Sequence, residues 1–254
     1  MKKISDLDIK SKKYIIFDLD GTLIDSIGVW NITDQKLIYK YSGLSVDLLE
    51  IQKIRDNFLN THVNHDIYLS FCNYLIKKYH FKDINDEKLL QDRWRISSDI
   101  LKNEMDYKEG VVPLIKHLKK LGYILILATM TTDVQIDIYT KKNTKMINQM
   151  NILDTFDYII KKEDVSKKKP DPEIYLKVLD YFHANKEECL IFEDSYTGVL
   201  AAKNAGIDVV NIYDSYADID RDKIRNITDY EINSYDEVLD CFNKKSKVRR
   251  KICQ

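Results

Sequence analysis

No run of about 18 consecutive apolar residues occurs in this sequence, and its basic N-terminus lacks the apolar stretch of a secretion signal. We therefore expect a cytoplasmic protein with no membrane partner. An excess of charge of one sign is also missing, because 40 basic and 41 acidic residues leave a net charge of −1. This balance provides no global field for binding nucleic acid, so a small molecule is the more natural partner.

Cysteine is scarce and scattered over four distant positions, Cys72, Cys189, Cys241 and Cys253, with no CxxC pair. Such spacing predicts reduced thiols rather than disulfides or zinc ligands. Repeats and low-complexity linkers are absent as well. Apolar residues nevertheless make up 44% of the chain, enough for a substantial core, and 254 residues suffice for one large domain or for a core with a smaller inserted domain.

Helical periodicity dominates residues 26–107. Apolar side chains recur at helical spacing in three stretches, which we interpret as the core-facing sides of a small helical bundle. The third helix is expected to begin at Asn85 or Asp86, residues typical of a helix N-cap. The three stripes are Leu48, Ile51, Ile54 and Phe58; Tyr68, Phe71, Cys72, Leu75, Ile76 and Tyr79; and Leu90, Trp94, Leu101 and Met105.

Short apolar runs alternate with helical stretches in the rest of the chain, a pattern typical of a parallel sheet covered on both faces. The predicted fold class is α/β, with a doubly wound, Rossmann-like core of residues 1–25 and 108–254 and an all-helical insertion of residues 26–107. The basic end, 244–254, is expected to be a frayed, solvated tail. Strands are expected from Tyr14, at Tyr123–Thr129, near Asp157, before Asp194, near Val209 and near Tyr230.

Two acidic residues follow the first predicted strand, in the sequence YIIFDLDGTLIDS. Asp18 and Asp20 are separated by one residue, and the two-residue period of a strand allows both carboxylates to share one side. Gly21 then lets the chain turn away. The arrangement suits a metal ion and a phosphate, but an ordinary Asp-Gly turn at the end of a strand is the alternative interpretation.

Further polar residues stand at the carboxyl ends of later strands, where parallel α/β sheets bind their ligands. Thr129 ends one strand with a hydroxyl group, although a simple helix N-cap would also explain it. Glu193 and Asp194 end another strand, and adjacent acids there can also merely cap the next helix. Between these strands, Lys169 precedes Pro170 in the stretch KKKPDPEIY.

Together and in this order, four motifs resemble those of the haloacid dehalogenase superfamily, in the phosphatase and phosphomutase branch that carries a helical cap. Its first motif, DxDGT, matches Asp18–Thr22, and its second, a hydroxyl residue after an apolar strand, matches Thr129. Its third, Lys-Pro-x-Pro, matches Lys169–Pro172, and its fourth, EDSxxGxxAAxxAG, matches Glu193–Gly206. The resemblance extends from Tyr14 to Leu239 and is weakest in the cap.

This resemblance implies a Mg²⁺-dependent phosphatase that hydrolyses a small phosphorylated metabolite through an aspartyl-phosphate. In such an enzyme Asp18 is the nucleophile and a Mg²⁺ ligand. Asp20 contributes its backbone carbonyl to the metal, while its carboxyl group exchanges protons with the leaving alcohol and the attacking water. Asp194 completes the side-chain ligands, and Glu193 holds a metal-bound water.

The resemblance also implies which groups receive the phosphate. A phosphate monoester is anionic, so a carboxylate attacks it only where cations neutralise the repulsion. Lys169 supplies one of these cations beside Mg²⁺. Thr129 and the backbone amides after Asp18, including those of Gly21 and Thr22, are the expected hydrogen-bond donors to the phosphoryl oxygens.

Small residues in the fourth motif have a structural interpretation. Gly198, Ala201, Ala202 and Ala205 are expected to form one face of a helix that approaches the sheet closely, as packing residues without a catalytic role. Gly206 can then take the left-handed conformation that ends a helix.

Two alternative functions stay open. Sugar-phosphate mutases of the beta-phosphoglucomutase type share all four motifs. They typically carry a histidine where Trp30 stands, and an arginine-containing cap loop that YSGLSVDLLEIQK does not match, so we favour hydrolysis. The second alternative is a catalytically weak metabolite-sensing module. Intact Asp18, Asp20 and Asp194 argue against it, because clustered carboxylates repel one another without a metal.

The predicted cap offers few clues to the substrate. His62, His65, Lys77 and Arg93 are candidate contacts, but each is more simply interpreted as a solvated side chain. Trp30 is expected on the first cap helix, either in the bundle core or at the wall of a substrate pocket. The sequence indicates neither a particular metabolite nor an oligomeric state.

Overall fold

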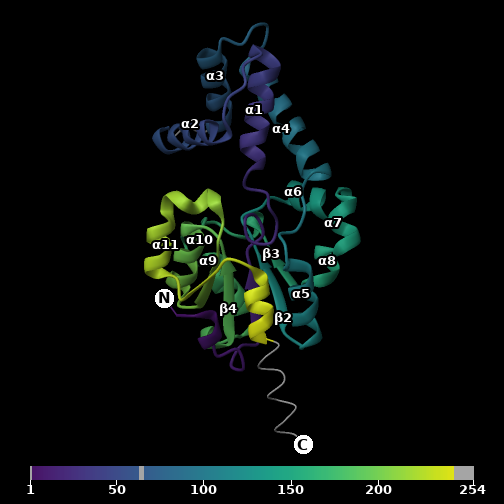
Figure 1. Ribbon diagram of the computed structural model, residues 1–254, viewed down its shortest axis with the longest axis vertical. Coiled ribbons are helices and arrows are strands. Elements are labelled where there is room, and N and C mark those ends of the chain that lie inside the picture. The colour runs from purple at the N-terminus through teal and green to yellow at the C-terminus, as the bar shows by residue number, and fades with distance from the viewer. Residues whose placement is uncertain (1, 63–65, 243–254) are drawn as a thin grey trace, which may run out of the picture. The chain divides into compact units, whose positions relative to one another are not determined.

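The computed structural model describes residues 2–62 and 66–242 (Figure 1). The chain divides into two compact units, which we call the core unit (Met1–Ser26 with Met105–Gln254) and the helical unit (Ile27–Glu104). The predictions made for His65, for Cys253 and for the basic tail 244–254 fall outside the described residues. Within the described part of the chain, no helix is both long and apolar enough to cross a membrane.

A six-stranded parallel sheet forms the centre of the core unit, and its strand order is β3-β2-β1-β4-β5-β6. Every predicted strand is present, which confirms the α/β fold class. The strands are β1 (Tyr14–Phe17), β2 (Ile124–Ala128), β3 (Tyr158–Ile160), β4 (Cys189–Glu193), β5 (Asp208–Ile212) and β6 (Tyr230–Ile232).

Strand register brings the motif residues together. Phe17, the last residue of β1, is opposite Leu127 of β2 on one side and Phe192 of β4 on the other. The next residue of each chain segment therefore lies at the same edge of the sheet. Since the strand order turns in opposite directions on the two sides of β1, this edge is the switch point where such sheets bind ligands.

Helices cover both faces of the sheet, which explains why its strands are continuously apolar. Figure 1 shows α9, α10 and α11 on one side and α5 and α8 on the other. Ala201, Ala202 and Ala205 of α10 are buried in the apolar cluster beneath that helix, as their spacing predicted. The main helices are α5 (Val111–Lys120), α8 (Ile152–Thr155), α9 (Glu173–Phe182), α10 (Tyr196–Ala205) and α11 (Arg221–Ile227).

Several short elements complete the core unit. The segment between β2 and β3, for which the sequence carried no prediction, contains α6 (Asp133–Asp137), a π-helical turn (Ile138–Lys142) and α7 (Thr144–Gln149). Short 3₁₀ segments lie at Ile4–Asp6, Lys162–Asp164, Lys186–Glu188 and Ser215–Asp220. The three described cysteines are buried and form no disulfide, which agrees with the prediction of reduced thiols.

The helical unit follows β1 and contains α1 (Val29–Ser42), α2 (Leu48–Thr61), α3 (Ile67–Tyr79) and α4 (Asp86–Asn103). Side-chain caps fix where three of these helices begin, and Asp66 caps α3 by accepting a hydrogen bond from the Leu69 amide (3.3 Å). Asp47 accepts hydrogen bonds from the backbone amides of Leu49 (2.9 Å) and Glu50 (3.2 Å) at the start of α2. Asn85 accepts one from the Lys88 amide (2.9 Å), so the prediction of Asn85 as the cap of α4 is confirmed.

Two residues of the helical unit that were predicted to lie in its apolar core are partly exposed instead. Tyr68 and Trp94 are 45% and 44% exposed, so their assignment to the bundle core was wrong. Arg93 takes the inward position instead. Its side chain is 2% exposed, and its Nε and Nη2 atoms donate to Asp34 at 2.7 and 3.3 Å. The expectation that Arg93 is solvated was therefore also wrong, because a buried carboxylate on α1 binds it.

Trp30 lies against this buried ion pair. Its ring is 4.6 Å from the Arg93 guanidinium carbon and 5.6 Å from the Trp94 ring, in an edge-on arrangement. The side chain is half-buried, so Trp30 does not belong to the fully buried apolar core of the unit. A guanidinium over an indole face is a favourable cation–π contact.

Candidate active site

Three carboxylates converge at the carboxyl edge of the sheet. Asp18 follows β1, Glu193 ends β4 and Asp194 comes next, and each of these side chains is buried. One oxygen from each lies within 4.8 Å of the other two. Carboxylate oxygens at this spacing are the hard donors that Mg²⁺ prefers.

One lysine donates hydrogen bonds to two of these carboxylates. Lys169 Nζ donates to Asp18 Oδ1 (2.7 Å), to Glu193 Oε1 (2.5 Å) and to the backbone oxygen of Ala128 (3.0 Å). An ammonium group has three hydrogens, so all three are engaged. The side chain is only 6% exposed, and the structure therefore places a fixed positive charge beside Asp18.

The cluster has more negatively charged groups than positively charged ones. Burial, with the charges of Glu193 and Asp194, raises the pKa of Asp18 well above its usual value despite the neighbouring Lys169. Burial and the charge of Glu193 raise the pKa of Asp194 to about 7. Burial opposes the charge of Lys169, but Asp18 and Glu193 outweigh this effect and raise its pKa. One ammonium group thus faces three carboxylates, and a further cation would fit this donor set.

Hydrogen bonds from neighbouring segments hold Asp194 in place. Its Oδ1 accepts from the Thr22 hydroxyl at 2.8 Å, and the Thr22 carbonyl accepts from the Tyr235 hydroxyl at 2.8 Å. The Asn211 amide on β5 donates to the backbone oxygens of Glu193 (3.0 Å) and Asp194 (3.1 Å). The turn after β4 is therefore fixed from two sides.

Asp20 has a different environment from Asp18, although the two residues are close in sequence. It does not belong to the three-carboxylate cluster, and it accepts hydrogen bonds from three hydroxyl groups. Ser26 and Tyr139 donate to Oδ1 at 2.5 and 3.0 Å, and Thr131 donates to Oδ2. The two aspartates of the first motif are thus prepared for different roles.

Thr129 follows β2 and is buried. Its hydroxyl pairs with the Thr131 hydroxyl at 2.6 Å, and it accepts a hydrogen bond from the Thr131 amide at 3.1 Å. The N-cap of the next helix is Thr132, which makes a reciprocal capping box with Gln135. Thr129 is therefore not the cap of that helix, and its hydroxyl belongs to the chain of groups that ends at Asp20.

The turn after Asp18 has its own hydrogen bonds. Gly21 has a φ of 81°, a left-handed conformation that glycine adopts without strain, and its amide donates to the Ile24 carbonyl at 2.9 Å. The Thr22 side chain is engaged with Asp194. The phosphate contacts expected for Gly21 and Thr22 remain predictions.

Gly198 has a role that its sequence context did not reveal. A Cβ atom at this position would lie 2.0 Å from Glu193 Oε2 and 2.1 Å from Glu193 Cδ. The Glu193 carboxylate also accepts a hydrogen bond from the Tyr175 hydroxyl at 2.6 Å. The glycine on α10 therefore makes room for a carboxylate of the site, and its interpretation as a packing residue alone was incomplete.

We expect Gly198→Ala to lower activity more than about tenfold, because the new methyl group would push Glu193 away from Lys169 and Tyr175. Overpacking of this kind costs roughly 1–3 kcal/mol of folding stability. Turnover and the free energy of unfolding should be measured together. Gly122→Ala is the matched control, since its left-handed φ of 84° makes it strained while no atom lies within 4 Å of the added Cβ. Equal activity loss in both variants would contradict a specific effect on Glu193.

The structure brings Asp18, Lys169, Glu193 and Asp194 into direct contact or close proximity, and it connects Asp20 to Thr129 through Thr131. Six further residues support the site and were not singled out from the sequence. Ser26, Thr131 and Tyr175 lie near the first, second and third motifs, whereas nothing in the local sequence marks the others. These supporting residues are Ser26, Thr131, Tyr139, Tyr175, Asn211 and Tyr235.

The chain is similar to several known proteins in sequence and in fold. A family model described as haloacid dehalogenase-like hydrolase matches residues 15–212. The phosphorylated carbohydrates phosphatase of Thermotoga maritima is 26% identical over 212 residues, covering 76% of this chain and 82% of that protein. The (DL)-glycerol-3-phosphatase 1 of Arabidopsis thaliana is 24% identical over 221 residues, covering 85% of this chain and 68% of that protein. The crystal structure of CbbY from Rhodobacter sphaeroides in complex with phosphate superposes with a TM-score of 0.64 at 20% identity, covering 88% of this chain and 95% of that chain.

Proposed function

The chain belongs to the haloacid dehalogenase-like hydrolase family, and from this premise we propose that it is a Mg²⁺-dependent phosphatase of a small phosphorylated metabolite. The observation that carries the proposal is the contact of Lys169 with Asp18 and Glu193 beside Asp194. The phosphatase names of the two relatives support the same reaction class. The helical unit, as the insertion after the first motif, is our candidate for the part that selects the substrate.

Asp18 is the proposed nucleophile. One of its oxygens attacks phosphorus, the ester P–O bond breaks, and the alcohol oxygen leaves with a proton from Asp20. Lys169 balances the negative charge of Asp18 and of the transferring group. Water then attacks the phosphorus of the aspartyl-phosphate, Asp20 takes a proton from that water, and the bond between Asp18 and phosphorus breaks to release inorganic phosphate.

The surroundings of Asp20 support a residue that gains and loses a proton in each cycle. Among the described residues, its three side-chain partners are the hydroxyl groups of Ser26, Thr131 and Tyr139. A hydroxyl group donates to an ionised carboxylate and accepts from a protonated one. The same partners can therefore hold Asp20 in both protonation states without a change of position.

The carboxylates of Asp18, Glu193 and Asp194 fit Mg²⁺ by their oxygen chemistry and their excess of negative charge. When bound, this ion would neutralise charge on the carboxylates and on the phosphate. Lys169 alone provides one positive charge at this point, which leaves two carboxylates uncompensated when all are ionised.

The raised pKa values of Asp18 and Asp194 predict how pH affects the metal-free protein. Because these folded-state pKa values exceed the unfolded ones, the stability gained from the bound protons is present at low pH. For Asp194 this stability is lost as pH rises from about 4 to about 7. We therefore expect Mg²⁺ to raise the melting temperature more at about pH 8 than at about pH 5.

Differential scanning fluorimetry at matched ionic strength would measure this difference. Asp194→Asn should reduce the Mg²⁺-induced shift at about pH 8, since it removes one charged ligand from the cluster. Equal shifts at both pH values, or an unchanged shift in Asp194→Asn, would contradict a metal site at these carboxylates.

Release of inorganic phosphate from p-nitrophenyl phosphate, with Mg²⁺ and then with excess chelator, tests the proposed function. A panel of phosphorylated metabolites ranked by kcat/KM would then identify the substrate class. Metal-dependent release is the expected result. Interconversion of glucose 1-phosphate and glucose 6-phosphate would favour the mutase, and no release from any compound would favour a sensing module.

A further inference from the structure

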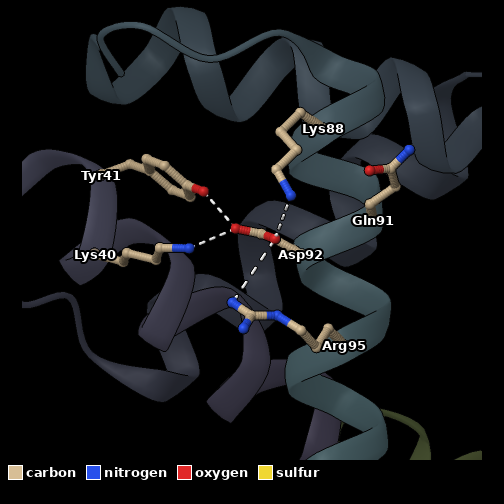
Figure 2. Close-up of a pocket in the computed structure, with 6 residues that line it drawn as sticks. All are labelled: Lys40, Tyr41, Lys88, Gln91, Asp92 and Arg95. Atoms are coloured by element: carbon tan, nitrogen blue, oxygen red, sulfur yellow. Dashed lines mark hydrogen bonds and ion pairs between the residues drawn. The ribbon is translucent and has the colours of Figure 1, made fainter.

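A second group of charged side chains lies in the helical unit, around a pocket of about 440 Å³. Figure 2 shows that Lys40 and Tyr41 extend from α1, and Lys88 and Arg95 from α4, toward the carboxylate of Asp92. The residues that line the pocket are Lys40, Tyr41, Lys88, Gln91, Asp92 and Arg95.

Asp92 organises this pocket. Its side chain is 5% exposed, and its carboxylate lies 2.5 Å from Lys40 Nζ, 3.2 Å from Lys88 Nζ and 3.7 Å from Arg95 Nη2. The Tyr41 hydroxyl donates to it as well. Hydrogen bonds from Lys40 and Tyr41 lower the pKa of Asp92, so this carboxylate is ionised. Three cations against one anion leave the lining with a net charge of +2.

The cations exceed what is needed to join the two helices. Lys40 and Tyr41 already connect α1 to Asp92 on α4. Lys88 and Arg95 belong to α4 itself, four residues before and three residues after Asp92, so they do not link it to another helix. Both are more than half exposed, at 59% and 65%, and they add positive charge at the pocket.

Hydrogen-bond donors also remain available there. A lysine ammonium has three N–H groups and an arginine guanidinium has five, and each cation here contacts Asp92 through a single nitrogen. The Gln91 side chain has no partner among the described residues, and its amide group supplies two further donors. Converging donors, positive charge and a concave shape are the requirements for recognising an oxyanion.

We propose that this pocket binds a small dianion through a phosphate group, either free phosphate or the phosphate of an organic molecule. One dianion matches the net charge of +2. A pocket of this size holds a compact ligand, whereas an extended acidic polymer would need a longer basic surface than the six lining residues supply. The site involves none of the residues assigned to catalysis.

Isothermal titration calorimetry of the full chain with inorganic phosphate, at low ionic strength and in excess chelator, tests the proposal. In excess chelator, no metal ion offsets the negative charge of the carboxylates around Asp18, so that site repels phosphate. The positive charges of the pocket are side chains of the protein, and chelator does not remove them. We expect saturable binding that weakens as salt is added. Arg95→Gln and Lys88→Gln should each weaken it about tenfold, the loss expected for one charge-assisted hydrogen bond.

Lys53→Gln is the matched control, because it removes one exposed positive charge from α2, away from the pocket lining. Gln91→Glu is a further variant, which removes no hydrogen bond or ion pair between described residues, and by lowering the net charge to +1 it should also weaken binding several-fold. Unchanged melting temperatures would show that the variants remain folded. Binding lost equally in Lys53→Gln, or retained in all pocket variants, would overturn the proposal.

Glycerol phosphate, titrated under the same conditions, separates the two sources of the phosphate group. Equal affinity would show that the pocket recognises the phosphate alone, and tighter binding would show that it also contacts the organic part. Both results support the site. No saturable binding of either compound, or heparin binding tightly while neither compound does, would overturn it.

Discussion

Asp18→Asn is expected to reduce phosphate release by more than roughly 10⁴-fold, because an amide is a poor nucleophile and a weaker ligand for a hard cation. The fold should survive the change. Lys169 keeps its hydrogen bonds to Glu193 and to the Ala128 carbonyl, and the buried carboxyl group of Asp18 already has a strongly raised pKa. Single-turnover kinetics and thermal unfolding of the same preparation would measure both effects.

Asp20→Asn serves as the matched variant. It keeps the nucleophile and loses only proton transfer, which contributes roughly 10²–10⁴-fold to a rate. A phosphoryl group trapped on Asp18 should then be detectable by mass spectrometry in Asp20→Asn and absent from Asp18→Asn. Wild-type turnover in Asp18→Asn would rule out the aspartyl-phosphate mechanism.

The second large effect is expected in the helical unit. Arg93→Leu should lower the free energy of unfolding of this unit by about 3–5 kcal/mol, because it leaves the buried Asp34 carboxylate without its bidentate partner. Arg55 Nη1, 3.7 Å from Asp34 Oδ2, compensates only in part, so we expect the lower end of this range. Both tryptophans of the chain, Trp30 and Trp94, belong to the helical unit, so denaturant unfolding followed by tryptophan fluorescence reports on it directly.

Two controls separate the buried pair from general charge effects. Arg95→Leu removes a 65% exposed arginine from the same helix and should change stability by less than about 0.5 kcal/mol. The double variant Asp34→Leu with Arg93→Leu should be more stable than Arg93→Leu alone, since the buried Asp34 carboxylate is removed with its partner and Arg55 keeps Asp56 at 3.6 Å. Equal destabilisation by Arg93→Leu and Arg95→Leu would contradict a special role for the buried pair.

Strand positions were the most predictable part of the fold, because buried parallel strands are continuous apolar runs that few other elements resemble. Their register, with Phe17 between Leu127 and Phe192, then brings Asp18 and Glu193 to one edge. Tyr139 was unpredictable for the opposite reason. It lies in a π-helical turn that no periodicity marks, yet its hydroxyl contacts Asp20.

The errors in the helical unit have a common physical origin. Apolar periodicity assumes that the inward face of a helix is apolar, and α4 places Arg93 there instead. An arginine is buried only where a specific carboxylate meets it, and Asp34 is 59 residues away in the chain. Arg93 faces inward, and the next residue of the helix, Trp94, is 44% exposed.

The hydrogen bond from Tyr235 to the Thr22 carbonyl connects the segment after β6 to the candidate site at the carboxyl edge of the sheet. All four sequence motifs end by Gly206, so a copy of the gene with an early stop codon before Tyr235 would still carry every one of them. Its product would lack the group that holds Thr22, and through Thr22 the carboxylate of Asp194. A search for the four motifs would identify such a truncated copy as intact. The length of its reading frame must also be examined to judge whether it encodes a working enzyme.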